Sequence, residues 1–355
     1  MRSRAAPWSL LGLAVLLALP WLLPQLLPQG QAQFWTASIL GRAIVFGIIA
    51  MSLTFLATYG GFVSLAQMMI AGIAGYTLAI FVEGAVPRVV GLLGYGVAIP
   101  LALLAATAMG ILVGAISLRS RDIYLLMITL ALGMGVFRFI ETNIAWFNGY
   151  EGIRNVVGPS LFGLDFRNAL VFYHAALGTA ALLYFGILYL VKTPFGLVLQ
   201  GIRDNPRRVA ALGYAVGLHR IAAFGVAGFI AGCGGVLSTI YNIGISPGSI
   251  GLGATVNILI MSVIGGLGHP IGAFIGSLIF TVLDTFAATI YDRDRFNTLI
   301  GLAFLAIVLV SPDGAIGVGA RLRRLLTAQP RPASRVCGEV RSRPPSTRTA
   351  KEEPP

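Results

Sequence analysis

The chain has 355 residues, of which 57% are hydrophobic and only 11% are charged. A soluble domain of this length carries about 25% charged residues, so the composition excludes an ordinary water-soluble enzyme. Apolar runs of about 20 residues recur along the chain, and each can cross a hydrocarbon layer of about 30 Å as a helix. The sequence therefore predicts an all-α polytopic membrane protein.

The formal net charge of +12 would also suit a nucleic-acid partner. The basic residues, however, lie mainly in the loops between apolar runs and in the C-terminal tail. That distribution is typical of a protein oriented in a membrane, and a contact of 321–324 with anionic lipid headgroups fits it as well. We therefore expect membrane lipids, and no nucleic acid, among its partners.

About ten apolar spans follow one another along the chain. We place them near residues 8–28, 36–58, 62–82, 97–117, 123–143, 169–191, 218–241, 250–266, 270–291 and 296–311. The first span is interpreted as a retained N-terminal anchor helix within residues 1–35, because no clear small-residue cleavage motif follows it. An even number of spans puts both termini on one side of the membrane.

Three segments are rich in basic residues: the 118–122 connection, the 192–220 loop and the C-terminal tail. In a ten-span topology they fall on one side, and the loops on the opposite side are nearly neutral. The positive-inside rule then makes the basic segments and both termini cytoplasmic. The tail over 316–355 has no apolar periodicity, and we expect it to be disordered.

Two spans, near 62–82 and 250–266, are weaker than the others because they are rich in small and polar residues, including Gln67 and Asn257. Such segments are either broken or partly re-entrant helices, which need protein or a water-filled cavity around the backbone, or simply closely packed helices. The sequence leaves both alternatives open. A Gly-Gly-x-x-Ser pattern at 60–64 and again at 234–238 also leaves an inverted internal repeat open.

Asp284 is the one acid well inside a predicted span. An unpaired charge there costs about 3 kcal/mol on insertion scales, so Asp284 should have a polar partner or line water. A structural contact and a contact with the pathway or another subunit both fit Asp284, and Gln67 and Asn257 are further candidates for the second role. Arg138 and Glu141, three residues apart on one helix face, are interpreted as a local pair.

The three histidines, His174, His219 and His269, lie near the ends of different predicted spans. A metal or acid–base site needs ligands that converge. We therefore expect neither a metal site nor catalytic residues.

The polar 192–220 loop interrupts the apolar sequence and contains a predicted helix over 207–213. In this helix the small residues Ala210 and Ala211 precede Gly213. A cytoplasmic loop with a compact small-residue surface suits docking on a soluble partner protein.

Several runs resemble the branched-chain amino acid ABC importer permease family. The resemblance covers about residues 36–315 and is closest to the longer, LivM-like half of that family. The runs that carry it are YGGFVSLAQ at 59–67, GIAGYT at 72–77, LRSRDIY at 118–124 with TLA at 129–131, TPFG at 193–196, RDN at 203–205, AALG at 210–213, ISP at 245–247 and VIGGLG at 263–268.

The resemblance implies a transmembrane permease subunit of an ATP-driven ABC importer in the bacterial inner membrane, with its permease core over 36–315. Such a chain pairs with a second permease subunit to form the pathway for branched-chain amino acids or a related small polar solute. Two cytoplasmic ATPase subunits hydrolyse the ATP, and an extracytoplasmic substrate-binding protein delivers the solute. The chain has no G-x-x-x-x-G-K-[ST] phosphate loop, so we expect no enzyme activity and no cofactor bound by this chain.

The resemblance also makes the loop near 192–220 the coupling segment to the ATPase. It assigns this coupling to six residues: Arg203, Asp204, Asn205, Ala210, Ala211 and Gly213. The coupling motif of ABC importers usually has an acidic residue before the paired alanines, where this chain has Arg208 and Val209. Branched-chain members of the family often depart from the motif there too. That departure puts any salt bridge from this position in question.

Other classes remain as alternatives. A permease of the same family for urea or amides would carry the same motifs. An ion-coupled secondary transporter would also be polytopic, but it should contain more membrane-embedded carboxylates than Asp284 alone. An integral membrane enzyme would need a clustered catalytic set, which the sequence does not show.

Overall fold

The structure is a computed structural model. It describes residues 34–82, 94–120, 122–154, 156, 160–161, 164–166, 168–290, 301, 314–315 and 317. The predicted spans at 8–28 and 296–311 and the tail over 316–355 lie outside the described residues, except for Gly301 and Gly317.

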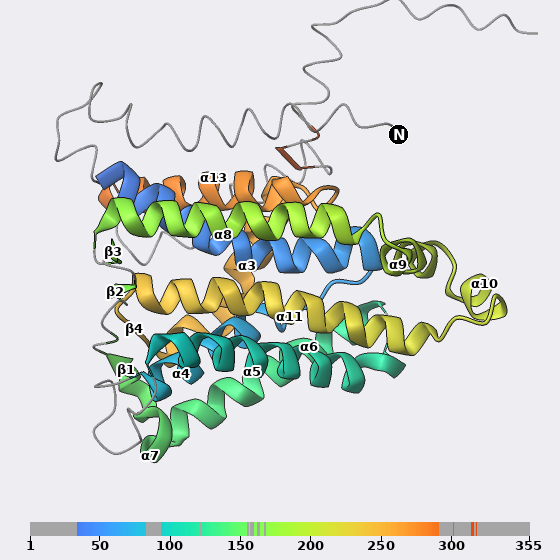
Figure 1. Cartoon of the computed structure of the whole chain (residues 1–355), viewed down its shortest axis with the longest axis horizontal. Coiled ribbons are helices and arrows are strands. Elements are labelled where there is room, and N and C mark those ends of the chain that lie inside the picture. Colours follow the sequence, from blue (N-terminus) through green and yellow to red (C-terminus); the bar gives the residue numbers. More distant parts are fainter. Residues whose placement is uncertain are drawn as a thin grey trace, which may run out of the picture.

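Long helices form the described core and lie roughly side by side in Figure 1. Each predicted span between residues 36 and 291 coincides with one of them. They are α3 (Arg42–Phe55), with π-helical segments η1 (Phe34–Gly41) before it and η2 (Leu56–Gly60) after it, α4 (Gln67–Phe81), α5 (Tyr95–Ile116), α6 (Asp122–Thr142), α8 (Ala169–Leu190), α11 (Val216–Tyr241), α12 (Leu252–Gly265) and α13 (Pro270–Ile290).

Within the described residues, 6 helical segments are long and apolar enough to cross a membrane, and α4 and Pro270–Phe286 are shorter apolar helices. With 15 residues, α4 is about 22 Å long, which is less than the hydrocarbon thickness of about 30 Å. Irregular backbone precedes α4 at 61–66 and α12 at 242–251. The weak span near 62–82 thus contains a short helix, whereas the one near 250–266 falls within Pro247–Gly265, one of the 6 segments long enough to cross a membrane. Both sequence-based alternatives for these spans stay open.

α11 is the central helix of the core and packs on α3, α4 and α5. Its glycines allow this close approach. A Cβ atom at Gly228 would lie 2.8 Å from the carbonyl oxygen of Ala106 on α5, and one at Gly235 would overlap the backbone of Ala71 on α4. Small residues thus let helix backbones meet where large apolar side chains would hold them apart.

A second group consists of α3, α12 and α13. Serine hydroxyls cross between these helices: Ser277 donates to the carbonyl of Ala43 at 2.8 Å, and Ser262 donates to that of Ala50 at 3.3 Å. α3 packs on α13 as α11 packs on α5, and α12 packs on α13 as α4 packs on α5. An inverted repeat would produce this exchange of partners, but the repeat itself stays a prediction.

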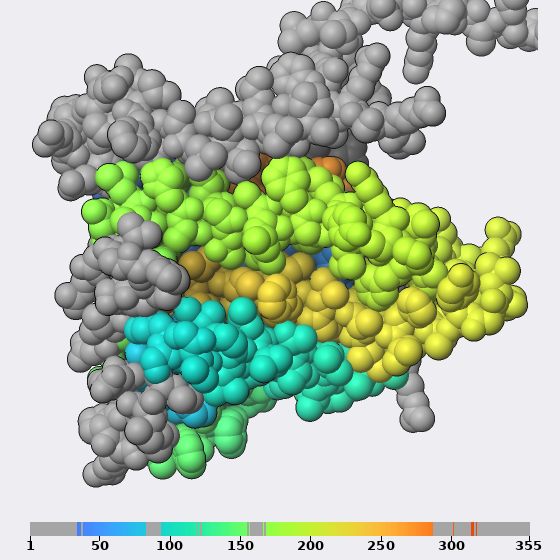
Figure 2. Space-filling model, in the orientation of Figure 1, coloured from blue at the N-terminus to red at the C-terminus, as the bar shows by residue number. Residues whose placement is uncertain are grey.

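The two ends of the core carry different elements. At one end, named the strand end here, β1 (Ile153–Arg154) pairs antiparallel with β4 (Gly244–Ile245), and β2 (Ser160–Leu161) pairs with β3 (Leu164–Asp165). The short helices α7 (Ile144–Phe147), η4 (Gly149–Glu151) and η5 (Pro247–Ser249) lie near these strands. At the other, coupling end lie η3 (Ser117–Arg119), α9 (Pro194–Asp204) and α10 (Pro206–Ala211), and α10 projects beyond the long helices in Figure 1. The space-filling view in Figure 2 shows the same projection.

Candidate functional site

The coupling segment is a pair of short helices whose shape follows from local sequence. Pro194 and Pro206 each occupy the first turn of a helix, where a missing N–H costs nothing. Between the helices, the Asn205 side chain accepts hydrogen bonds at 3.1 Å from the backbone N–H groups of Arg207 and Arg208 and so caps α10. Gly213 lies just beyond α10 with a φ of 87°, a conformation that favours glycine. Asn205 and Gly213 therefore shape the segment.

The exposed residues of the segment include several apolar ones beside the charged Asp204, Arg207 and Arg208. Ala210 and Ala211 are exposed. Beside them Leu212 is 76% exposed and Tyr214 is 48% exposed. We name this set (Ala210, Ala211, Leu212, Tyr214) the coupling surface.

Arg203 and Asp204 differ in their surroundings, although they are neighbours. Asp204 is exposed at the end of α9. Arg203 keeps substantial exposure, yet its guanidinium donates a hydrogen bond to the backbone carbonyl of Thr58 at the end of η2. The structure thus turns one of the six predicted coupling residues toward the helix core.

A cavity of about 500 Å³ lies between the coupling segment and the core. Gly61, Ser117 and Arg203 are among its lining residues, so it joins η2, the α5–α6 connection and α9. This geometry places the basic 118–122 connection at the same end as the basic coupling segment. Nearby, the ring of Phe62 stacks on that of Phe224 at 5.4 Å, and the Arg220 guanidinium lies 5.8 Å from the centre of the Phe62 ring.

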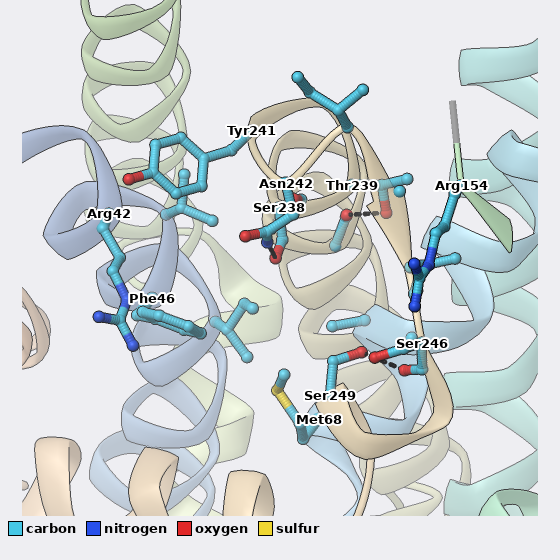
Figure 3. Close-up of a pocket in the computed structure, with 18 of the residues that line it drawn as sticks. Arg42, Phe46, Met68, Arg154, Ser238, Thr239, Tyr241, Asn242, Ser246 and Ser249 are labelled. Atoms are coloured by element: carbon cyan, nitrogen blue, oxygen red, sulfur yellow. Dashed lines mark hydrogen bonds between the residues drawn. The ribbon is translucent and has the colours of Figure 1, made fainter. Parts of the chain in front are cut away.

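A second cavity, of about 630 Å³, opens at the strand end between α3, α4 and the end of α11. Figure 3 shows Arg42 and Phe46 on one side of it and Arg154 on the other, with serine side chains between them. Its polar lining residues are Arg42, Glu151, Arg154, Ser238, Thr239, Asn242, Ser246 and Ser249, and its apolar ones include Val45, Phe46, Ile49, Met68 and Ile245. The cavity combines two cations, one carboxylate and several hydroxyls with an aliphatic and aromatic wall.

Asp284 forms an ion pair with Arg42, whose Nη1 lies 2.6 Å from the Asp284 Oδ2. The Arg42 guanidinium also lies 5.5 Å from the centre of the Phe46 ring. The expectation of a polar partner for Asp284 is therefore confirmed, and that partner lines the strand-end cavity. Sequence reasoning missed Arg42, although a cation inside the apolar 36–58 run was a signal for it.

Gln67 and Asn257 do not join this pair. Gln67 is fully buried and accepts a hydrogen bond at 3.0 Å from the hydroxyl of Ser52 on α3. Ser52 and Arg42 are about 15 Å apart along α3 at 1.5 Å per residue, so Gln67 and Asp284 lie at different depths of the core. Asn257 is half-buried on α12, and neither Gln67 nor Asn257 is among the lining residues of the two cavities.

Other polar side chains make local contacts. Arg138 Nη1 lies 2.7 Å from Glu141 Oε2, which confirms the predicted pair on α6. His269, between α12 and α13, accepts a hydrogen bond at 3.2 Å from the Ile271 N–H. Burial lowers the pKa of His269, so this imidazole is neutral at pH 7.

Comparison with known proteins agrees with this arrangement. The family model described as branched-chain amino acid transport system / permease component matches residues 35–310, more than half of the chain. The high-affinity branched-chain amino acid transport system permease protein LivM of Escherichia coli K12 is 25% identical over 244 residues, and the match covers 62% of this chain and 57% of LivM. The chain therefore spans less than two thirds of that relative.

Two further relatives widen the comparison. The probable branched-chain amino acid transport permease protein LivM of Methanocaldococcus jannaschii is 27% identical over 283 residues, and the match covers 72% of this chain and 80% of that protein. The autoinducer 2 import system permease protein LsrC of Enterobacter sp. strain 638 is 28% identical over 253 residues, and the match covers 67% of this chain and 68% of that protein. No solved structure matches the chain.

The family match extends over the whole described helix core, from η1 to α13, and includes both cavities and the coupling segment. The apolar helices of this core are those of a multi-pass membrane protein. The chain belongs to the family of permease components of branched-chain amino acid transport systems.

Proposed function

We propose that the chain is a permease subunit of an ATP-driven ABC importer in the bacterial inner membrane. In this proposal it forms part of the pathway for branched-chain amino acids or a related small polar solute. The observation that carries the proposal is the contrast between the two ends of one helix core. A polar cavity opens at the strand end, and an exposed apolar coupling surface projects from the other end.

The strand-end cavity suits a small solute with both polar and aliphatic groups. Its volume of about 630 Å³ falls within the range of about 300–1,000 Å³ that is usual for small-molecule pockets. Arg42 and Arg154 provide the planar donors that pair well with a carboxylate. Phe46, Ile49 and Met68 provide apolar surface for a side chain. In this arrangement an extracytoplasmic binding protein would release its solute into the cavity.

Two features support partner subunits. The coupling surface would dock on one of two ATPases, which would hydrolyse the ATP that this chain has no phosphate loop to bind. In α5 and α6 only 28% and 22% of the most apolar stretch is buried within the chain. Their open apolar faces are available to lipid or to a second permease subunit.

The proposal leaves a choice between solutes of different chemistry, and two relatives define that choice. One is named for branched-chain amino acids and the other for autoinducer 2, and urea or an amide is a further alternative within the family. An ion-coupled secondary transporter is disfavoured because it should contain more membrane-embedded carboxylates than Asp284, the one acid well inside a predicted span.

Co-purification tests the proposal. The full chain, tagged at its C-terminus and expressed with its neighbouring genes, is extracted in mild detergent and its companions are identified by mass spectrometry. We expect a second membrane subunit and ATPase subunits in fixed proportion, and we expect an unrelated polytopic protein with the same tag to bring neither. A chain that is purified alone and still supports uptake driven by an ion gradient would contradict the proposal.

A further inference from the structure

Two hydrogen bonds in series join the coupling segment to the helix core. The Arg203 guanidinium donates to the backbone carbonyl of Thr58. The Thr58 hydroxyl in turn donates to the carbonyl of Leu267 at 2.5 Å. Leu267 belongs to the connection between α12 and α13. The series therefore links three segments that are far apart in the sequence.

The Thr58 carbonyl needs a partner from outside its own helix. The helix ends at Gly60, and Gly61 follows with a φ of 74°. The last carbonyls of a helix have no intrahelical donors, and they also form the negative end of the helix dipole, which favours a cation. Arg203 meets both requirements from α9.

Packing holds α9 against this helix end. A Cβ atom at Gly61 would lie 2.6 Å from Arg203 Cγ and 3.3 Å from Arg203 Cα. On the same helix, Leu199 and Ile202 are almost completely buried. α9 is thus seated on the core, and it cannot shift relative to η2 without disturbing these contacts.

The two hydrogen bonds lead to two segments, one after Thr58 and one around Leu267, and each of them interrupts the helix core. Gly61 begins the irregular run that precedes α4, and Leu267 follows Gly266, whose φ is 104°. Glycines in such conformations permit a change of chain direction with little steric cost, and short irregular segments of this kind absorb hinge motions.

We propose that Arg203 is a positioning residue that transmits movement of the coupling segment to these two interruptions, an inference that rests on the proposed function. When α9 and α10 move with the ATPases, the hydrogen bond from Arg203 to Thr58 moves the start of α4 with them. The hydrogen bond from Thr58 to Leu267 moves the α12–α13 connection. α4 contributes Met68 and Gly72 to the strand-end cavity, so the movement reaches the wall of that cavity. Arg203 serves transmission, and the coupling surface serves docking.

The test compares Arg203→Ala with Arg207→Ala in the complete importer, reconstituted in proteoliposomes with its second permease, ATPases and binding protein. Arg207 is the matched control because it is a neighbouring exposed arginine of α10 for which the structure shows no side-chain contact among the described residues. We expect Arg203→Ala to lower the solute transported per ATP hydrolysed at least about 5-fold, the lower end of typical coupling between sites. Assembly with the ATPases should be unchanged, Arg203→Lys should restore part of the ratio, and Arg207→Ala should leave it at the wild-type value.

A second variant tests the hydrogen bond between Thr58 and Leu267 separately. Thr58→Val preserves the carbonyl that Arg203 binds and removes only the hydroxyl that reaches Leu267, so we expect a smaller fall in the same ratio. A wild-type ratio in Arg203→Ala overturns the inference, and so does loss of assembly in both Arg203 variants, which would make the residue a structural cap. If the wild-type chain instead binds no ATPase or transports without ATP, the proposed function itself fails, and that result does not depend on any variant.

Discussion

The arginine side chains at the two ends of the helix core have different kinds of partner. At the strand end, arginine faces acid: Arg42 pairs with Asp284 at 2.6 Å, and Arg154 lies 4.0 Å from Glu151. At the coupling end, Arg203 binds a backbone carbonyl, and no acid takes part in that contact. A side-chain pair beside an open cavity can exchange a partner for a solute, whereas a bond to a helix carbonyl ties two backbone segments together. The difference is consistent with the proposed roles, solute recognition at one end and transmission at the other.

The largest expected effect comes from breaking the strand-end ion pair. Asp284→Leu leaves Arg42 without its partner inside an apolar span, at a cost of about 3 kcal/mol, which the partial exposure of the pair lowers somewhat. We expect much less assembled permease in the membrane, measured by quantitative immunoblotting and by the melting temperature of the purified complex. Asp284→Asn, which keeps the shape, should be better tolerated.

The double variant Arg42→Leu/Asp284→Leu is the control for this effect. It removes both charges, so it should assemble better than Asp284→Leu alone, because an unpaired buried charge is more costly than an absent pair. Normal assembly and normal uptake by Asp284→Leu would show that the ion pair contributes nothing.

The next effect concerns the coupling surface. Replacing Gly213 by a bulky residue should reduce transport, but its φ of 87° means that any side chain there also strains the backbone. Ala210→Trp is therefore the cleaner change, because Ala210 is exposed in regular helix. We expect it to lower uptake and transport-linked ATP hydrolysis together by about 10-fold or more, equivalent to about 1.4 kcal/mol of lost docking.

Ala210→Ser is the matched control, since it keeps a small side chain on the same surface. It should retain wild-type uptake, and both variants should reach the membrane in equal amounts. Wild-type ATP hydrolysis by the Ala210→Trp complex would remove the docking role from this surface.

A smaller effect is expected at the strand-end cavity. Arg154→Gln removes one cation from its wall. A hydrogen bond to a charged group contributes about 1.5–3 kcal/mol, but the Arg154 side chain is 76% exposed, and solvent screening lowers this contribution to about 1.4 kcal/mol. KM for a carboxylate solute should therefore rise about 10-fold with little change in kcat. Arg138→Gln removes a cation that is already paired with Glu141 on α6 and should leave KM unchanged. An unchanged KM for Arg154→Gln would exclude this side of the cavity from solute binding.

The last prediction concerns which end of the core faces which compartment, and we expect its variants to change transport least. Tyr150 and Leu212 are 78% and 76% exposed at the strand end and the coupling end. In a chain with its native cysteines replaced by serine, Tyr150→Cys should react with an impermeant thiol reagent on intact cells and Leu212→Cys should not. Equal labelling would contradict the predicted orientation, as it would for the pair Ser160→Cys and Ser334→Cys.

Much of the fold follows from local sequence, and the site follows only in part. Each apolar run between residues 36 and 291 became a helix, because length and apolarity are local properties. The pair of Arg138 and Glu141 was predictable for the same reason, since a spacing of three places both on one helix face. The position of Asp284 inside an apolar span predicted a polar partner, but no sequence pattern identified Arg42, on the first described helix, as that partner.

Arg203 shows a second limit of sequence reasoning. The motif grouped it with Asn205, Ala210 and Gly213 as one docking unit, yet the structure separates these residues by role. Asn205 caps a helix, Gly213 makes a turn, and Arg203 reaches Thr58. Which tertiary carbonyl lies within reach of a side chain depends on how α9 is seated on η2, and no local pattern encodes that contact.

ATP-dependent uptake tests the central claim most directly. The chain is reconstituted in proteoliposomes with its second permease, ATPases and binding protein, and accumulation of a labelled branched-chain amino acid is measured with ATP, without ATP, and with an imposed proton or sodium gradient alone. We predict accumulation only with ATP, and its loss when Ala210→Trp replaces the wild-type chain. Accumulation driven by an ion gradient through this chain without the ATPases would contradict its assignment as an ABC importer permease.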